Sequence, residues 1–177
     1  MVRWSIFLGL AVTSVTLAVP RADGYTVTVA APALQKAVEA YFPITRENAL
    51  GVVTLSHPRV ILRPGSRRIA LATHVRAAMP DQPPLTGNGV VDGEIAYDPA
   101  RHEFHLREPR VSSLAIDGVE GPFAALIESA VEVLTQDQFP VIVLYRLDEA
   151  VLRAAPKLRM LKAVGIRDGA LVLELAF

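Results

Sequence analysis

The stretch RIALATHVRAAM at residues 68–79 decides the fold class of this 177-residue chain. Every second position carries an apolar or small residue, so one side of an extended chain would present Ile69, Leu71, Thr73, Val75, Ala77 and Met79. His74 and the two arginines fall on the other side. Because successive side chains of a strand point to opposite faces of a sheet, this alternation predicts a long strand with one buried and one wetter face.

Similar patterns occur on both sides of this stretch. Long strands joined by short turns are expected over residues 50–62, 68–79, 89–97 and 104–116. Two prolines interrupt the pattern: Pro58 follows His57 at a break in the first strand, and Pro109 indicates a bulge or an edge in the last. Strands connected in this way predict an antiparallel meander with one apolar face.

Helical periodicity appears before and after the meander. Residues 31–42 carry apolar side chains at helical spacing and end before Pro43, and 122–139 form the longest amphipathic pattern in the chain. The remaining expected elements are a strand at 25–29, a strand at 141–145, a helix at 148–163 broken at Pro156, and a hairpin of 163–166 and 171–177. The fold class predicted from these elements is α+β, in one domain.

The N-terminal residues 1–24 have the features of a secretory signal peptide. A basic residue near the start precedes an apolar stretch that is short for a transmembrane helix. The small residues Ala22 and Gly24 fit the positions before a cleavage site. Cleavage after Ala18 and an uncleaved N-terminal anchor are the alternatives. We expect a periplasmic protein whose single domain covers 25–177.

Composition excludes several classes of chemistry. The chain has 18 basic and 18 acidic residues, and this balance argues against a nucleic-acid-binding protein, which ordinarily has a basic face. The chain also has no cysteine, which excludes disulfides, thiolate nucleophiles, cysteine-held metals and lipid attachment to a cysteine. Any catalysis would therefore depend on histidine, serine, threonine or carboxylates.

The four histidines show no spacing typical of a metal site. His102 and His105 are three residues apart on an expected strand, which places them on opposite faces. His57 and His74 have no partner at ligand spacing in the sequence. We therefore expect no metal and no cofactor.

Three other features have an ordinary structural interpretation beside a functional one. The glycines of GNGVVDG at 87–93 precede a strand rather than a helix, so they indicate a loop and a bulge instead of a phosphate-binding loop. Asp92 and Glu94 share the expected solvent face, whereas a catalytic carboxylate pair needs a cleft. Arg67 and Arg68 suit an anionic headgroup or a solvated surface. No enzyme is expected, and a hydrolase with an unrecognised serine or histidine site is the remote alternative.

Diffuse motifs extend over almost all of 25–177. They comprise Tyr25-Thr26-Val27-Thr28, a short helix with Leu34 and Val38, the meander, the helix 122–139, Pro140-Val141 before an apolar strand, and a hairpin with Gly165-Ile166 and Gly169-Ala170-Leu171-Val172-Leu173. In this order they resemble the YceB-like family of bacterial envelope lipoproteins, a family of unknown function that is similar to the tubular lipid-binding (TULIP) fold. The resemblance implies a strongly curved antiparallel sheet wrapped around a long amphipathic helix. Family members usually carry a lipid-modified cysteine, which this chain lacks.

If the resemblance holds, an apolar groove lies between the sheet and the helix 122–139. The residues that would line it are Ile69, Leu71, Val75, Ile95, Phe104, Leu106, Leu126, Ile127, Val131 and Leu173. The expected function is a binding protein or carrier for lipids or other apolar ligands, with transient contact to a membrane surface. The same residues could instead fill a solid core, as most apolar strand faces do. The alternative is therefore a structural or partner-binding envelope protein with no ligand.

Overall fold

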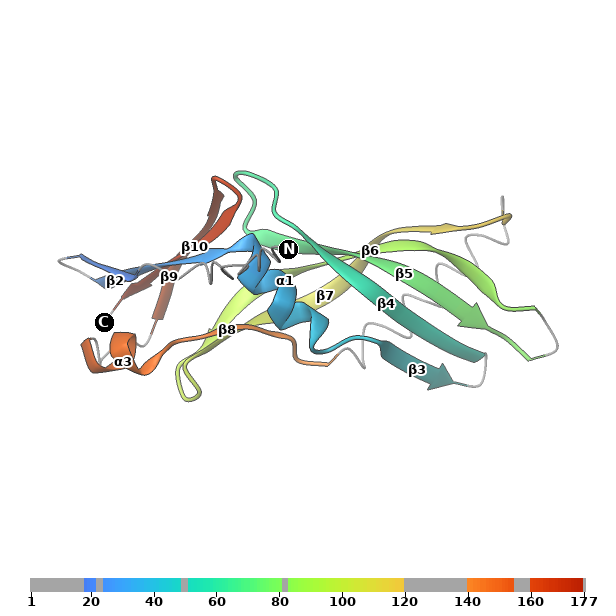
Figure 1. Cartoon of the computed structure of the whole chain (residues 1–177), viewed down its shortest axis with the longest axis horizontal. Helices are drawn as coiled ribbons and strands as arrows, with labels where there is room; N and C mark the ends of the chain where they lie inside the picture. The colour runs from blue at the N-terminus through green and yellow to red at the C-terminus, as the bar shows by residue number, and fades with distance from the viewer. Residues whose placement is uncertain are drawn as a thin grey trace, which may run out of the picture.

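The computed structural model describes residues 18–21, 24–48, 51–80, 83–119, 140–154 and 160–176. Its elements in chain order are β1 (Ala18–Arg21), β2 (Gly24–Ala30), α1 (Ala31–Glu39), β3 (Ile44–Asn48), β4 (Gly51–Ile61), β5 (Arg68–Ala78), β6 (Leu85–Asp98), β7 (Glu103–Ile116), β8 (Val143–Arg146), α3 (Glu149–Ala154), β9 (Met160–Arg167) and β10 (Ala170–Ala176). The strands form a six-stranded sheet in the order β3-β4-β5-β6-β7-β8 and a four-stranded sheet in the order β1-β2-β10-β9. The small sheet lies at one end of an elongated molecule (Figure 1).

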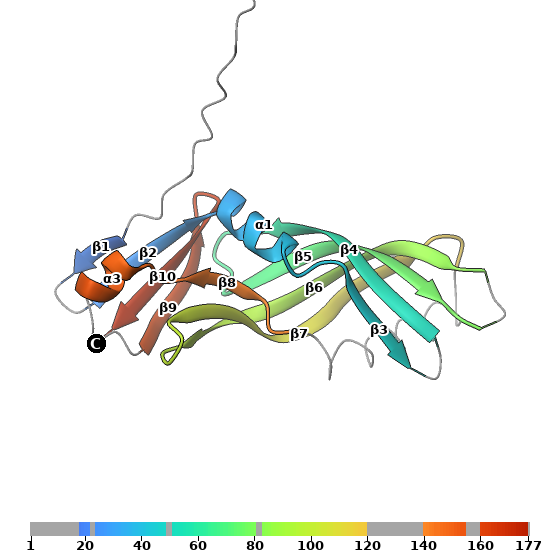
Figure 2. The same ribbon diagram turned by 60° about the horizontal axis from the view of Figure 1, so that its bottom comes forward.

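The six-stranded sheet confirms the predicted meander. Strands β4 to β7 pair antiparallel in chain order, and the sheet is strongly curled (Figure 2). Leu55 lies opposite Val75, and Leu71 lies opposite Val91, so the apolar positions of neighbouring strands share one face. We call this buried side the inner face and the opposite side the outer face. From Leu71 to Ala78 burial along β5 alternates as its sequence predicts, because this part of the strand presents one side to the core. Ala70 differs, since it lies on the outer face and is buried as well.

The glycines at 87–93 lie inside β6, so the expected loop at this position is wrong. Gly87, Gly89 and Gly93 fall on the inner face, where the neighbouring strands approach closely. A Cβ on Gly93 would lie 2.7 Å from Cγ of Leu106, because the leucine side chain packs directly over the glycine. The register between β6 and β7 shifts between Val90 and Val91 and again between Asp92 and Glu94, which confirms the predicted bulge. The absence of side chains here permits close packing that a β-branched residue would prevent.

Both proline breaks of the meander are bulges. His57 has a φ of 50°, and the register between β4 and β5 skips from Ser56 to Arg59. In β7, Glu108 has a φ of 47° and precedes Pro109, which lies beside the register shift opposite β6. Histidine enters this left-handed region more readily than most residues. The bulge in β4 places His57 and Arg59 as exposed side chains, while Pro58 between them is buried.

Helix α1 begins where its periodicity predicts but ends at Glu39 instead of 42. It lies over the curled sheet, in contact with β2, β4 and β8. Pro32 occupies the first turn, and Leu34 and Val38 are buried. Gln35 connects the helix to the edge of β4: its Nε2 donates to the Pro58 carbonyl at 2.7 Å, and its Oε1 accepts from the Val60 N–H at 2.8 Å. These bonds satisfy a part of the strand edge that β3 does not reach.

The four-stranded sheet joins the two ends of the domain, since β2 pairs with β10. The predicted hairpin is confirmed, but its first strand starts earlier than expected. Residues 160–163 were expected to be helical and instead begin β9, because pairing with β10 continues along the edge. Gly65 links the two sheets by donating its N–H to the Ile166 carbonyl at 3.3 Å. Strand β1 falls within the stretch expected to be a signal peptide, and it pairs with β2.

Some predictions fall outside the described residues. The long helix 122–139, with Leu126, Ile127 and Val131, is among them, as are Pro156 and Phe177. Of the two described helices, neither is long and apolar enough to cross a membrane.

Candidate functional site

The described members of the predicted groove gather in one buried cluster. Six of them lie on the inner face of the six-stranded sheet, and Leu173 joins them from β10: Ile69, Leu71, Val75, Ile95, Phe104, Leu106 and Leu173. None is more than 7% exposed, which is the value for Ile95. The structure thus brings these seven residues together, in close contact with the apolar side of the small sheet.

The inner face has few polar side chains. Thr73 is buried there, and its hydroxyl donates to the Gly89 carbonyl at 3.5 Å. On the opposite side of β7, Glu103 is also buried, and its Oε1 accepts from Nε of Arg146 on β8 at 2.8 Å. No buried side-chain nitrogen or oxygen of the described residues lacks a hydrogen-bond partner. An apolar ligand would therefore meet a mostly aliphatic wall whose polar groups are already satisfied.

Aromatic rings line one end of the inner face. The rings of Tyr97 and Phe104 have centroids 4.8 Å apart, and Tyr145 stacks on Phe104 at 6.4 Å. Burial raises the pKa of Tyr97, and the nearby Asp98 charge raises it further. The Tyr97 hydroxyl lies 3.1 Å from Nδ1 of His102. Tyr97 is therefore a neutral phenol that closes this end of the apolar cluster.

The position of His102 differs from the sequence-based prediction. This residue lies in the turn before β7, with a φ of 55°, and not on a strand with His105. The turn starts at Asp98, whose carboxylate accepts the N–H groups of Ala100 and Arg101 at 2.8 and 3.2 Å. No group of three or more potential metal ligands occurs among the described residues.

A hollow opens where the two sheets meet, and we call it the junction hollow. Its volume is about 290 Å³, and its apolar walls come from Ile95 on β6 and from Leu161, Ala163 and Val164 on β9. Arg67, Glu94 and Lys162 complete the lining. Ile95 therefore belongs both to the predicted groove and to a surface opening.

The carboxylates near the junction hollow form ion pairs with arginines. Arg68 binds Asp92, with 2.7 Å from Nε to Oδ1, and also approaches Glu94 at 3.4 Å. Arg107 contacts the other oxygen of Glu94 at 3.1 Å. The shared face predicted for Asp92 and Glu94 is confirmed, and both carboxylates bind arginine. Arg67 and Lys162 have no carboxylate partner among the described residues.

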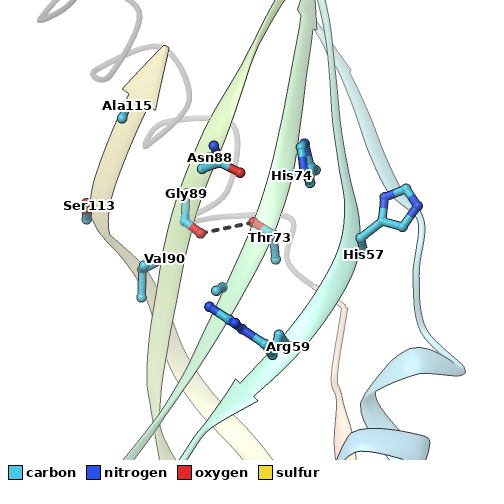
Figure 3. Close-up of a pocket in the computed structure, with 10 residues that line it drawn as sticks. His57, Arg59, Thr73, His74, Asn88, Gly89, Val90, Ser113 and Ala115 are labelled. Carbon is cyan, nitrogen blue, oxygen red and sulfur yellow. Dashed lines mark hydrogen bonds between the residues drawn. The ribbon is translucent and has the colours of Figure 1, made fainter. Parts of the chain in front are cut away.

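A second hollow, of about 420 Å³, lies on the outer face (Figure 3), and we call it the outer hollow. Its lining comes from β4, β5, β6 and β7 and consists of His57, Arg59, Ala72, Thr73, His74, Asn88, Gly89, Val90, Ser113 and Ala115. The His57 and His74 rings meet edge to face with centroids 5.7 Å apart. Sequence reasoning missed this site because the partners lie far apart in the chain. The break at His57-Pro58 and the outward position of His74 were its available signals.

No protein-family model matches the chain, and a search of curated proteins finds no significant match.

Proposed function

We propose that the protein is a non-enzymatic binding protein or carrier for lipids or other apolar ligands. The observation that carries this proposal is the junction hollow, because Ile95, a member of the buried apolar cluster, also lines this opening. An acyl chain has no polar groups to satisfy, and its transfer from water gains roughly 0.8 kcal/mol per methylene. A mostly aliphatic face with an opening is sufficient for such a ligand.

The rim of the junction hollow suits the polar end of the same ligand. Arg67 and Lys162 are exposed beside the apolar walls, and the charge of Glu94 is balanced by Arg68 and Arg107. An anionic headgroup could therefore meet two cations while its chain contacts Leu161 and Val164. This arrangement supports transient contact with an anionic membrane surface.

The proposal includes a TULIP-like arrangement in which the curled sheet wraps the amphipathic helix 122–139. The strongly curled antiparallel sheet supports this arrangement. It also includes membership of the YceB-like family and a periplasmic location reached through a signal peptide at 1–24. The acyl chain would then lie between that helix and the inner face.

Native mass spectrometry tests the proposal on protein purified from a bacterial periplasm without detergent. We expect co-purified phospholipid or fatty acid at a defined stoichiometry. Ala163→Trp narrows the junction hollow at a half-buried position, and it should reduce ligand occupancy. Ala78→Trp makes the same change on the outer face of β5, away from the opening, and should leave occupancy unchanged. A ligand-free mass that persists after incubation with phospholipid vesicles would contradict the carrier.

A second candidate is a structural or partner-binding envelope protein. Dense packing favours it, because the described residues of the predicted groove are buried against one another. Val141 and Met160 are 63% and 60% exposed, and such residues suit contact with a protein partner. The ligand-free mass described above would favour this candidate.

A further inference from the structure

The outer hollow is built from two adjacent rows of paired residues that cross the same four strands. One row runs from Ser56 through His74 and Asn88 to Ala115, and the other comprises Arg59, Ala72, Val90 and Ser113. The lining includes the small side chains Ala72, Ser113 and Ala115. Figure 3 shows Ser113 and Ala115 on β7, on the opposite side from His57 and Arg59 on β4. The register of the sheet therefore creates a shallow basin with polar walls.

The bulge in β4 concentrates nitrogen donors at one wall of this basin. It places His57 on the outer side in addition to Arg59, and His74 contacts the His57 ring. Figure 3 shows Arg59 extending from β4 toward the strands that bear Ala72 and Val90. Asn88 and Ser113 add an amide and a hydroxyl from the facing strands. Donors from four strands thus surround one volume.

Charge is distributed unevenly over the outer face. At the opposite end of β5 and β6, Arg68 is compensated by Asp92 and Glu94. No carboxylate lines the outer hollow, and Arg59 has no carboxylate partner among the described residues. An anion bound there would supply the missing charge without displacing an existing ion pair.

We propose that the outer hollow binds a phosphate group, either in a free phosphate compound or in a lipid headgroup. The planar guanidinium of Arg59 can bind two phosphate oxygens at once, whereas the remaining oxygens can accept from the His74 imidazole and the Asn88 amide on the neighbouring strands. The small side chain of Ala72, next to Arg59 in the row, allows the anion to approach the sheet. This site lies on the outer face and does not depend on lipid binding at the inner face.

The test is an NMR titration of backbone amides with inorganic phosphate at constant ionic strength, with chloride as the competing anion. We expect saturable shifts confined to residues around His57, His74 and Asn88. Arg59→Gln should weaken binding roughly ten- to a hundredfold, because hydrogen bonds to charged groups are the strong ones. Arg63→Gln removes the same charge from the exposed turn after β4 and should leave binding unchanged.

A second variant separates shape from charge. Ala72→Leu fills part of the outer hollow and retains every donor, so it should abolish saturable binding. Unsaturable shifts, or equal weakening by Arg59→Gln and Arg63→Gln, would overturn the proposal.

Vesicle flotation identifies the source of the phosphate group. Vesicles of equal parts phosphatidylcholine and phosphatidylglycerol are compared with phosphatidylcholine alone. Flotation with the anionic vesicles that Arg59→Gln abolishes and Arg63→Gln preserves would assign the site to headgroups. Saturable phosphate binding without such flotation would assign it to free phosphate compounds.

Discussion

The Gln35 side chain forms the two backbone hydrogen bonds that a neighbouring strand would otherwise form with the edge of β4. It pairs with the Pro58 carbonyl and the Val60 N–H, where the edge of β4 would otherwise be unpaired. Gln35→Ala should lower the free energy of unfolding by about 1–3 kcal/mol in urea, because two partly buried backbone groups lose their partner. Glu39→Ala removes only the exposed contact with Gln35 and should change stability by less than about 0.5 kcal/mol. Equal effects of the two variants would contradict this role.

The burial of Tyr97 predicts a loss of stability at alkaline pH. Its pKa is raised above the ordinary 10.0, first by desolvation and then by Asp98, so the folded state retains the phenol proton longer than the unfolded state. Stability should therefore fall as pH rises through the unfolded pKa, since the unfolded state then binds fewer protons. Tyr97→Phe should remove this part of the slope. Ultraviolet titration should show that a tyrosine with a raised pKa is lost in the variant, and an unchanged titration would contradict the assignment.

At the scale of elements, β6 depends on a glycine that faces a leucine. Gly93→Ala places a methyl group against Leu106 and should destabilise by about 1–3 kcal/mol through overpacking. Leu106→Ala alone should cost about 2–5 kcal/mol because it leaves a cavity. The double variant should be less destabilised than the sum, since the added methyl occupies part of the space that the leucine leaves. Denaturation of all four proteins measures this coupling, and simple additivity would contradict the packing.

A strand could be predicted from the sequence where its apolar and polar residues alternate and only one of its sides is buried. The alternation of β5 is reproduced except at Ala70, which is buried although it lies on the outer face. The glycines on the inner face of β6 led to the wrong prediction of a loop, because glycine usually indicates a loop or turn. Close packing between strands leaves no pattern in the local sequence that would have indicated a strand here. The start of β9 was likewise missed, because its pairing with β10 decides the structure of 160–163.

At the scale of the whole molecule, long-range register decides which residues meet. The burial of the described residues of the predicted groove could be predicted, because the alternation in each strand indicates it. The outer hollow could not, because Arg59, Asn88 and Ser113 come together only after three strand pairs are in register. The pairing of β2 with β10 is of the same kind, since no local pattern connects the beginning of the domain to its end.

The two sheets should unfold as one cooperative unit, because buried residues of both belong to a single apolar cluster. Leu71 on β5 and Leu173 on β10 are fully buried. Leu71→Ala and Leu173→Ala should each lower the free energy of unfolding by about 2–5 kcal/mol and move the same transition. Far-ultraviolet circular dichroism and tyrosine fluorescence should report coincident curves for each protein. Two separate transitions, with Leu173→Ala moving only one of them, would instead mean that the four-stranded sheet and the six-stranded sheet are independent folding units, and the domain expected over 25–177 would then have to be divided.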